Sequence, residues 1–294
     1  MKQYLSIGKL LIDYRKEHGI SQLDFAAMVQ VDIRTVQRWE KDETLIKPEK
    51  EKELARETLL PYQLIRNLNA LSPIPTYYDF RIRKYSLSEL NNDLPDANWF
   101  KERINDFSKR VRVIDVNTDM EVLSKDLSIQ KHQNKIIART VLAEAVRLLP
   151  ELNLIITDDY FNYSGHCIVL PLKEKAYQKI LEREIEPAAL GVDDLRPFRS
   201  TENPIFFNYD ITADCNDNIF FLAHQYFNFF LELQDWEYRY CTYTLRYDTY
   251  RLNEQLGLHL VWEDPVQKDG LGLEYHPRFY IGNFKEYLSS LKDG

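Results

Sequence analysis

The stretch from Ser21 to Asp42, SQLDFAAMVQVDIRTVQRWEKD, constrains this chain more than any other. Its apolar residues recur at helical spacing, which gives each of two short helices one buried stripe. Ser21 and Asp32 stand where N-caps belong, because each offers a side-chain oxygen to the N–H groups of a helix start. The stretch therefore predicts two short helices joined by a tight turn. The apolar positions are Leu23, Phe25, Ala26, Val29, Val31, Ile33, Val36 and Trp39.

If Asp32 caps the second helix, a polar and mostly basic face points away from Val36 and Trp39. Arginine and glutamine can form paired hydrogen bonds with guanine and adenine edges in the major groove of DNA. The pattern therefore favours a DNA-reading helix. Its outward residues are Arg34, Thr35, Gln37, Arg38 and Lys41.

The stretch resembles the helix-turn-helix of the lambda-repressor-like (XRE) transcription factors. The residues that match the family pattern are Ser21, Gln22, Phe25, Ala26, Val31, Thr35, Val36, Arg38, Trp39 and Glu40. Two positions depart from it, since Gln30 stands where the turn usually has glycine and Asp42 replaces the glycine that ends the second helix. A positive φ at Gln30 would require a strained or altered turn.

The resemblance implies roles for individual residues. Gln22 would contact a phosphate, whereas Ile33, Arg34, Gln37 and Arg38 would read bases. The full set of expected DNA-contacting residues is Gln22, Asp32, Ile33, Arg34, Thr35, Gln37, Arg38 and Lys41. Double-stranded DNA is the expected partner, bound by a homodimer whose two reading helices lie about one helical turn apart. A helical domain of this kind can also serve as a protein-interaction module without binding DNA.

The charge distribution fits local rather than general DNA binding. The chain of 294 residues carries 38 basic and 46 acidic side chains, the wrong overall sign for coating nucleic acid. Residues 1–70 hold 12 basic and 11 acidic side chains, so residues 71–294 hold 26 and 35. A small basic face on a near-neutral domain predicts weak background binding and dependence on site-specific, dimeric contact.

Cysteine and histidine usage indicates neither a disulfide framework nor a metal site. Three widely separated cysteines are typical of a reduced intracellular protein. His166 and Cys167 are neighbours, but adjacent residues of a strand point to opposite faces, so we expect no metal there. No signal peptide is recognisable, and no apolar run reaches the ~18 residues that span a bilayer. We expect a cytoplasmic protein without membrane contact.

The flanking segments complete an all-α N-terminal domain over residues 1–71. Residues 6–17 predict a scaffold helix that stops at His18-Gly19, and further helices are expected over 48–60 and from Pro61. Two prolines, Pro73 and Pro75, mark a hinge. Residues 72–98 then read as a linker or arm, with the stretch from Tyr78 to Tyr85 as a short strand or an ordered arm. Its basic cluster, Arg81, Arg83 and Lys84, is interpreted as a solvated face rather than a phosphate contact.

Residues 99–294 predict a larger α+β domain with a mixed sheet. Helices are expected over 99–110, at the segment ending near 149, over 173–185, 219–234 and 246–257. Strands are expected over 111–117, 153–158, 165–172, 204–212, 238–245, 259–264 and 274–281. The many aromatic residues between Phe206 and Tyr250 are interpreted as core rather than as the lining of a ligand pocket.

The order of these elements resembles the C-terminal half of a GNAT-type acyltransferase. Residues 205–212 correspond to its central strand, 250–257 to the helix ending in Leu-Gly-Leu, and 258–262 to the next strand. In that family, a glycine-rich loop after the central strand binds the pyrophosphate of coenzyme A at a helix N-terminus. Here the loop reads ADCNDNIFF, which has no glycine but contains Asp214 and Asp217. These aspartates would repel a pyrophosphate.

The sequence thus leads to a sequence-specific transcription regulator, dimeric, with a degenerate GNAT-like domain that senses a small molecule or holds the dimer together. No cofactor, catalytic residue or metal is expected. The alternative is an active N-acyltransferase that uses acetyl-CoA and is fused to a DNA-binding domain. Its acid and base would come from Tyr209, Asp210 and Asp214, with Tyr247 or Tyr250.

Overall fold

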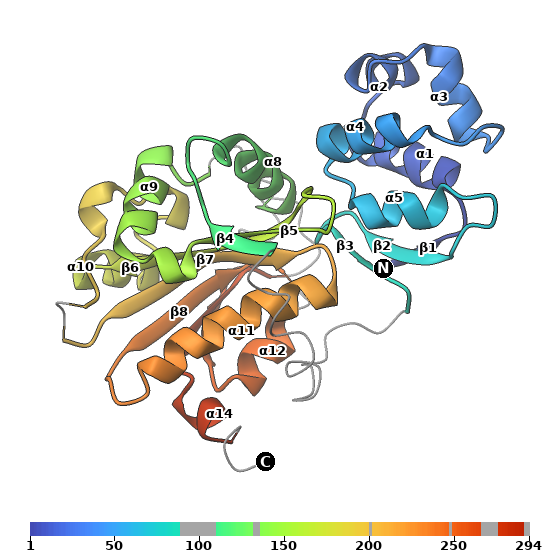
Figure 1. Cartoon of the computed structure of the whole chain (residues 1–294). Helices are drawn as coiled ribbons and strands as arrows, with labels where there is room; N and C mark the ends of the chain where they lie inside the picture. Colours follow the sequence, from blue (N-terminus) through green and yellow to red (C-terminus); the bar gives the residue numbers. More distant parts are fainter. Residues whose placement is uncertain (89–109, 132–135, 200–201, 247–248, 266–275, 291–294) are drawn as a thin grey trace. The chain divides into compact units, whose positions relative to one another are not determined.

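The structure is a computed structural model that describes residues 1–88, 110–131, 136–199, 202–246, 249–265 and 276–290. The chain divides into two compact units. The first comprises the described parts of Met1–Asp93, Thr157–Ser164 and Ala213–Asn218, and the second comprises the described remainder of the chain. Figure 1 gives the element labels. The helix expected at 99–110 lies almost wholly outside the described residues.

Five helices form most of the first unit. They are α1 (Ile7–Glu17), α2 (Gln22–Met28), α3 (Ile33–Glu40), α4 (Pro48–Thr58) and α5 (Tyr62–Leu68). Each begins within two residues of the predicted position. Their apolar faces meet in one core that includes Leu10, Phe25, Val36, Leu54 and Leu64. One predicted stripe residue departs from the pattern, because Leu23 is 64% exposed.

A three-stranded sheet completes the first unit. It has the order β1 (Lys2–Tyr4), β2 (Thr76–Asp79), β3 (Lys84–Ser86), and both pairings are antiparallel. Tyr4 and Tyr78 point into the helical core, where both are almost fully buried. The expected linker or arm over 72–98 therefore differs from the structure in its described part. Residues 76–86 form a hairpin that pairs with the first residues of the chain, because its aromatic residues need the core of the helical unit.

Glu51 joins α4 to α5 from a fully buried position. Its carboxylate accepts hydrogen bonds from Arg66 Nη1 at 2.9 Å and from Asn69 Nδ2 at 2.5 Å. Asn69 also donates to the carbonyl of Ile46 and accepts from its N–H. A buried carboxylate is tolerated when it is paired and hydrogen-bonded in this way. The network fixes the loop that leads out of α3.

A seven-stranded mixed sheet forms the centre of the second unit, with the order β4-β5-β6-β7-β8-β10-β9. β7 and β8 are parallel, whereas β4 with β5, β8 with β10, and β9 with β10 are antiparallel. The strands are β4 (Val111–Val113), β5 (Leu154–Thr157), β6 (Tyr163–Leu172), β7 (Ile205–Ala213), β8 (Arg239–Thr244), β9 (His259–Glu263) and β10 (Arg278–Gly282). The mixed sheet confirms the predicted α+β class.

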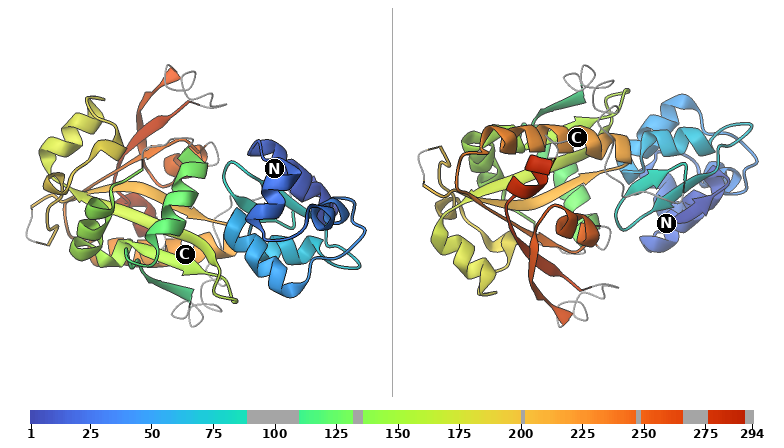
Figure 2. Two further views of the ribbon diagram at one scale, coloured as in Figure 1. Left: turned by 90° about the horizontal axis from the view of Figure 1, so that it is seen from above. Right: turned by 90° about the horizontal axis from the view of Figure 1, so that it is seen from below.

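Helices cover both faces of this sheet. α8 and α9 lie over one face and α11 over the other (Figures 1 and 2). The α-helices are α8 (Met120–Lys131), α9 (Arg139–Leu148), α10 (Glu174–Leu181), α11 (Asn216–Glu232), α12 (Tyr250–Gln255) and α14 (Lys285–Ser290). Short 3-10 turns occupy Pro150–Leu152, Pro187–Ala189 and Val192–Asp194. Within the described residues, no helix is long and apolar enough to cross a membrane.

Aromatic side chains fill the space between α11 and the sheet, as predicted. Phe206 and Phe230 contact each other edge to face with ring centroids 5.4 Å apart. Phe284 packs on Phe230 at 4.9 Å and on Tyr240 at 4.5 Å. Such edge contacts stabilise a core beyond the effect of area burial alone. The aromatic residues therefore have a packing role that accounts for their number.

Candidate DNA-binding face

Local capping fixes the ends of α2 and α3 where the sequence predicts them. Ser21 Oγ accepts a hydrogen bond from the N–H of Asp24 at 3.1 Å. Asp32 Oδ1 accepts from the N–H of Arg34 at 2.8 Å. Each cap satisfies a donor that the first turn of a helix leaves open. Asp32 is thus engaged in holding the start of α3, although its side chain is exposed.

The turn between the two helices carries the strain expected from its sequence. Gln30 has φ +52°, the left-handed conformation that glycine adopts at no cost. Lys50 of α4 donates to the carbonyls of Val29 and Gln30 at 3.2 and 3.0 Å. A cation at the C-terminal end of a helix is favourable and satisfies the open carbonyls. Lys50 therefore stabilises a turn that lacks glycine.

The end of α3 shows a comparable arrangement at Asp42, which has φ +56°. Its Oδ1 accepts a hydrogen bond from the N–H of Gly8 at 2.9 Å. A Cβ at Gly8 would lie 2.6 Å from the carbonyl oxygen of Trp39 and 2.7 Å from that of Glu40. Because backbone atoms cannot move aside cheaply, glycine at position 8 allows α1 to approach α3. Asp42 thus replaces the usual glycine and adds a tie to α1.

The two faces of α3 differ as predicted. Val36 and Trp39 are 0% and 3% exposed, which anchors the helix in the core. Arg34, Arg38 and Lys41 are exposed. Ile33, Thr35 and Gln37 are half-buried, since they lie at the edge of the outward face. The structure thus places all the expected α3 residues on or beside one surface.

Gln22 lies in a network that the sequence analysis missed. Its Nε2 donates to Glu40 Oε2 at 2.6 Å, and its Oε1 accepts from Gln37 Nε2 at 3.4 Å. Glu40 in turn forms a two-bond pair with Arg15 of α1, at 2.5 and 3.1 Å. Arg15 also donates to the carbonyl of Ile20 at 3.0 Å. The network holds α1, α2 and α3 in register and orients Gln22 beside Gln37.

Two of the tyrosines named as a candidate acid or base for the acyltransferase alternative, Tyr209 and Tyr250, make structural contacts. Tyr209 OH accepts from the N–H of Ile137 at 3.0 Å, and Tyr250 OH donates to the carbonyl of His276. Burial raises the pKa of the Tyr209 hydroxyl. Tyr247 lies outside the described residues. These partners give both described tyrosines a role in packing.

Asp214 lies at the loop before α11, buried in the first unit. Burial raises the pKa of its carboxyl to about 6, against the opposing effects of Arg83 and of hydrogen bonds from Asn218 and Ser164. Asn218 Nδ2 donates to Asp214 Oδ1 at 2.8 Å. The carbonyl of Asp214 accepts from the N–H of Tyr85 at 2.7 Å. This aspartate is therefore an internal group of the unit that holds the helix-turn-helix.

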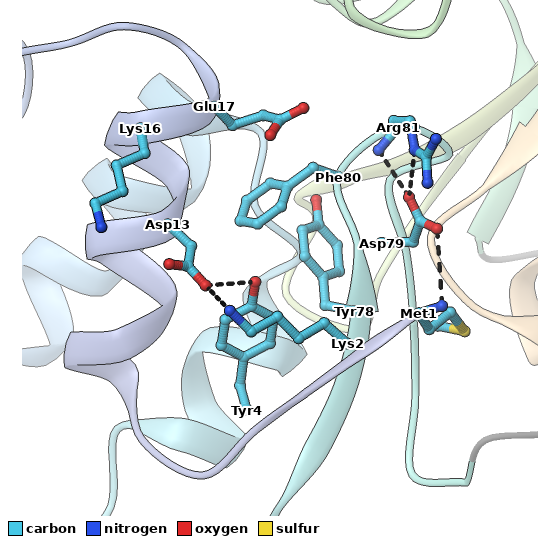
Figure 3. Close-up of a pocket in the computed structure, with 10 residues that line it drawn as sticks. All are labelled: Met1, Lys2, Tyr4, Asp13, Lys16, Glu17, Tyr78, Asp79, Phe80 and Arg81. Atoms are coloured by element: carbon cyan, nitrogen blue, oxygen red, sulfur yellow. Dashed lines mark hydrogen bonds and ion pairs between the residues drawn. The ribbon is translucent and has the colours of Figure 1, made fainter. Parts of the chain in front are cut away.

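A hollow of about 550 Å³ opens between β1, β2 and the outer side of α1 (Figure 3). Both of its aspartates are paired: Asp13 forms ion pairs with Lys2 and with Lys9, which lies outside the hollow, and Asp79 lies 3.9 Å from Arg81. Tyr4 donates to Asp13 at 3.2 Å. Ten residues line the hollow, namely Met1, Lys2, Tyr4, Asp13, Lys16, Glu17, Tyr78, Asp79, Phe80 and Arg81. None of them belongs to the expected DNA-contacting set.

Comparison with known proteins identifies the N-terminal helices. Residues 11–61 match the helix-turn-helix family, which covers the chain from within α1 to the end of the loop after α4. No curated protein matches the chain significantly by sequence. A solved structure, the C-terminal condensation domain of Ebony in complex with beta-alanyl-dopamine, is similar over 59% of this chain and 97% of its own. At 13% identity and a TM-score of 0.36, it bears on neither the fold nor the activity and does not support the expected GNAT-like identity.

Proposed function

We propose that the chain is a sequence-specific transcription regulator that reads DNA with α3. The observation that carries the proposal is the exposed basic face of α3, held by a capped helix-turn-helix whose sequence matches that family. In the major groove, Arg34 and Arg38 can each donate two hydrogen bonds to guanine, and Gln37 can pair with adenine. Thr35 and Lys41 flank them and suit phosphate contacts.

Gln22 has a narrower role under this proposal than the resemblance alone implies. One of its amide N–H groups is used by Glu40, which leaves the second for a phosphate oxygen. Its fixed orientation lowers the entropy lost on binding. Gln22 and Gln37 would then approach DNA as a preassembled pair.

The weak net charge of the N-terminal segment supports a dimeric mode of binding. Residues 1–70 hold only one more basic than acidic side chain. Nonspecific attraction to DNA is therefore small. Two copies on a palindromic site, about 34–36 Å apart, would supply the missing affinity and the selectivity. The dimer is therefore part of the proposal.

We further propose that the second unit is a degenerate GNAT-like domain for sensing or dimerisation. Support comes from the parallel pair β7 and β8 joined through α11, followed by α12 and β9, which is the order on which the resemblance rests. The loop before α11 carries Asp214 and no glycine, and Asp217 lies in the first turn of α11. Carboxylates at this position disfavour an anionic cofactor such as coenzyme A.

The same parallel pair is what favours the alternative, an active acetyl-CoA-dependent acyltransferase. Two assays separate the functions. Selection of the purified full chain against random duplexes should enrich a palindrome, and acetyl-CoA should leave the melting temperature unchanged. Enrichment of no sequence would refute the regulator. A clear acetyl-CoA shift would instead support the alternative for the second unit.

A further inference from the structure

Three ionisable side chains from distant parts of the chain meet inside the second unit. Asp126 of α8, His166 of β6 and Asp210 of β7 place one donor atom each within 4.8 Å of the other two. His166 Nε2 lies 3.0 Å from Asp210 Oδ2, and His166 Nδ1 lies 3.8 Å from Asp126 Oδ2. Asp126 and His166 are 0% exposed, and Asp210 is 9% exposed. The cluster is separate from the DNA-binding face.

Buried apolar residues lie beside the cluster on α8 and β6, whereas its same-face neighbours Ser164, Asn208 and Thr212 are buried polar residues. On α8, Leu123 and Leu127 are fully buried on the same helix face as Asp126. On β6, Ile168 lies two residues after His166, on the same face of the strand, and is equally buried. Positions of this kind normally hold aliphatic side chains, because aspartate and histidine are seldom fully buried without a specific partner. Three such residues at one point indicate a shared function.

Their chemistry suits a divalent transition-metal ion. One imidazole nitrogen and two carboxylates are ligands that Zn²⁺, Mn²⁺ and Fe²⁺ accept. Two carboxylates and a neutral imidazole balance the charge of a divalent ion, which favours such a site in an apolar interior. Ligands about 2.1 Å from one ion in tetrahedral geometry lie about 3.4 Å apart. The 3.0 Å separation between His166 Nε2 and Asp210 Oδ2 is close to this value. Asp126 lies 3.8 Å from the other ring nitrogen, Nδ1, so its carboxylate would have to move toward the Nε2 side to complete the site.

We propose that Asp126, His166 and Asp210 form a binding site for a divalent transition-metal ion. The ion would tie α8 to the two central strands β6 and β7. Because all three ligands are buried, its role would be to stabilise the second unit rather than to activate a substrate. This inference extends beyond the proposed DNA binding and does not depend on it. It also departs from the expectation that the sequence offers no metal site.

The competing explanation is a direct contact of the His166 ring with the two aspartates, without an ion. The two explanations predict different metal contents. The full chain, purified without chelator, should hold close to one equivalent of metal by elemental analysis. After chelator treatment, titration with Zn²⁺ or Mn²⁺ should raise the melting temperature by about 5–10 °C at a hundredfold excess over the dissociation constant. Co²⁺ at the site should give a visible ligand-field absorption band.

Variants locate the ion. His166→Gln and Asp210→Asn should each weaken metal binding by more than about tenfold, since each removes a ligand. His259→Asn, at an exposed histidine of β9, should retain the bound metal and the melting shift. Far-ultraviolet circular dichroism and chemical denaturation of each variant report whether the chain still folds, and the wild-type titration decides the proposal if His166→Gln does not fold. An absence of stoichiometric metal and of any melting shift in the wild type would overturn it, as would equal metal loss in His259→Asn.

Discussion

Ionisable residues occupy opposite environments in the two units. Arg34 and Arg38 of α3 and its C-cap residue Lys41 are exposed to solvent, whereas Trp39 anchors the buried side of this short helix. In the second unit, His166 and Asp210 lie within a buried part of the central strands. The first arrangement leaves charge available for a large external partner, whereas the second can act only on what the interior encloses. Under the two proposals, recognition belongs to the surface helix and stabilisation to the buried cluster.

The largest expected effect comes from a substitution on the buried side of α3. Trp39→Ala should lower the free energy of unfolding of the N-terminal unit by about 3–5 kcal/mol, because it leaves a cavity in a packed core. Arg38→Ala, its neighbour on the exposed face, should change that free energy by less than about 0.5 kcal/mol. Chemical denaturation followed by circular dichroism measures both. Equal effects would contradict the division of α3 into a buried and an exposed face.

The second effect tests buried charge within the first unit. The carboxyl pKa of Asp214 is raised from 3.8 to about 6 in the folded chain, so the folded state binds the proton more tightly than the unfolded state does. The stability contributed by this group is therefore lost as pH rises from about 4 to about 6, by about 3 kcal/mol for two pKa units. Asp214→Asn removes the titration and should stabilise the chain above pH 6.

Denaturation midpoints of wild type and Asp214→Asn across this pH range provide the measurement. The difference between the two proteins isolates Asp214 from all other carboxylates. Asp217→Asn, three residues further along the chain, is the matched control and should follow the wild-type profile. Parallel profiles for wild type and Asp214→Asn would show that Asp214 does not titrate in this range.

A third effect concerns the network that joins the reading helices. Glu40→Gln should lower the free energy of unfolding by about 1–3 kcal/mol, because it removes the charge that faces a largely buried Arg15. The side chains of Arg15 and Glu40 are 14% and 6% exposed, so solvent screening is limited. Glu43→Gln, an exposed glutamate just after α3, should have little effect. Thermal denaturation of the two variants distinguishes a structural network from incidental proximity.

The smallest effect concerns the turn. Gln30→Gly should stabilise the chain by about 0.5–1 kcal/mol, since glycine adopts positive φ without strain but loses more entropy on folding. If Lys50 compensates for the missing glycine, Lys50→Met should lower the free energy of unfolding more in the wild-type chain than in the Gln30→Gly variant. A double-mutant cycle on the unfolding free energy measures this coupling. If the effects of Gln30→Gly and Lys50→Met on the unfolding free energy are additive, Lys50 does not compensate for the missing glycine.

Local patterns made the N-terminal unit predictable. The caps Ser21 and Asp32, the stripe ending in Trp39 and the strain at Gln30 follow from residues a few positions apart. The hairpin pairing of residues 2–4 with 76–78 could not be predicted, because it depends on residues more than 70 positions apart.

Contacts between residues far apart in the sequence also explain which site residues could not be predicted. Arg15 reaches Glu40 across 25 positions, and no periodicity links them. Asp126, His166 and Asp210 are separated by 40 and 44 positions, and they meet only because β6 and β7 are neighbours in the sheet. The adjacent Cys167 made His166 a metal candidate in the sequence, but Cys167 is not part of the cluster. The one sequence signal for this cluster is that an ionisable residue, His166, stands within an otherwise apolar stretch.

The most direct test of the account is the affinity of single α3 variants for a site selected from random duplexes. Arg34→Ala should weaken binding to that site by about 1–3 kcal/mol and relax base preference at one position. Lys47 is an exposed lysine before α4. Lys47→Ala should lower the affinity for the selected and the scrambled duplex equally, or leave both affinities unchanged. Loss of preference in Arg34→Ala alone would establish that α3 reads DNA. Unchanged affinity and preference in Arg34→Ala, Gln37→Ala and Arg38→Ala would contradict it.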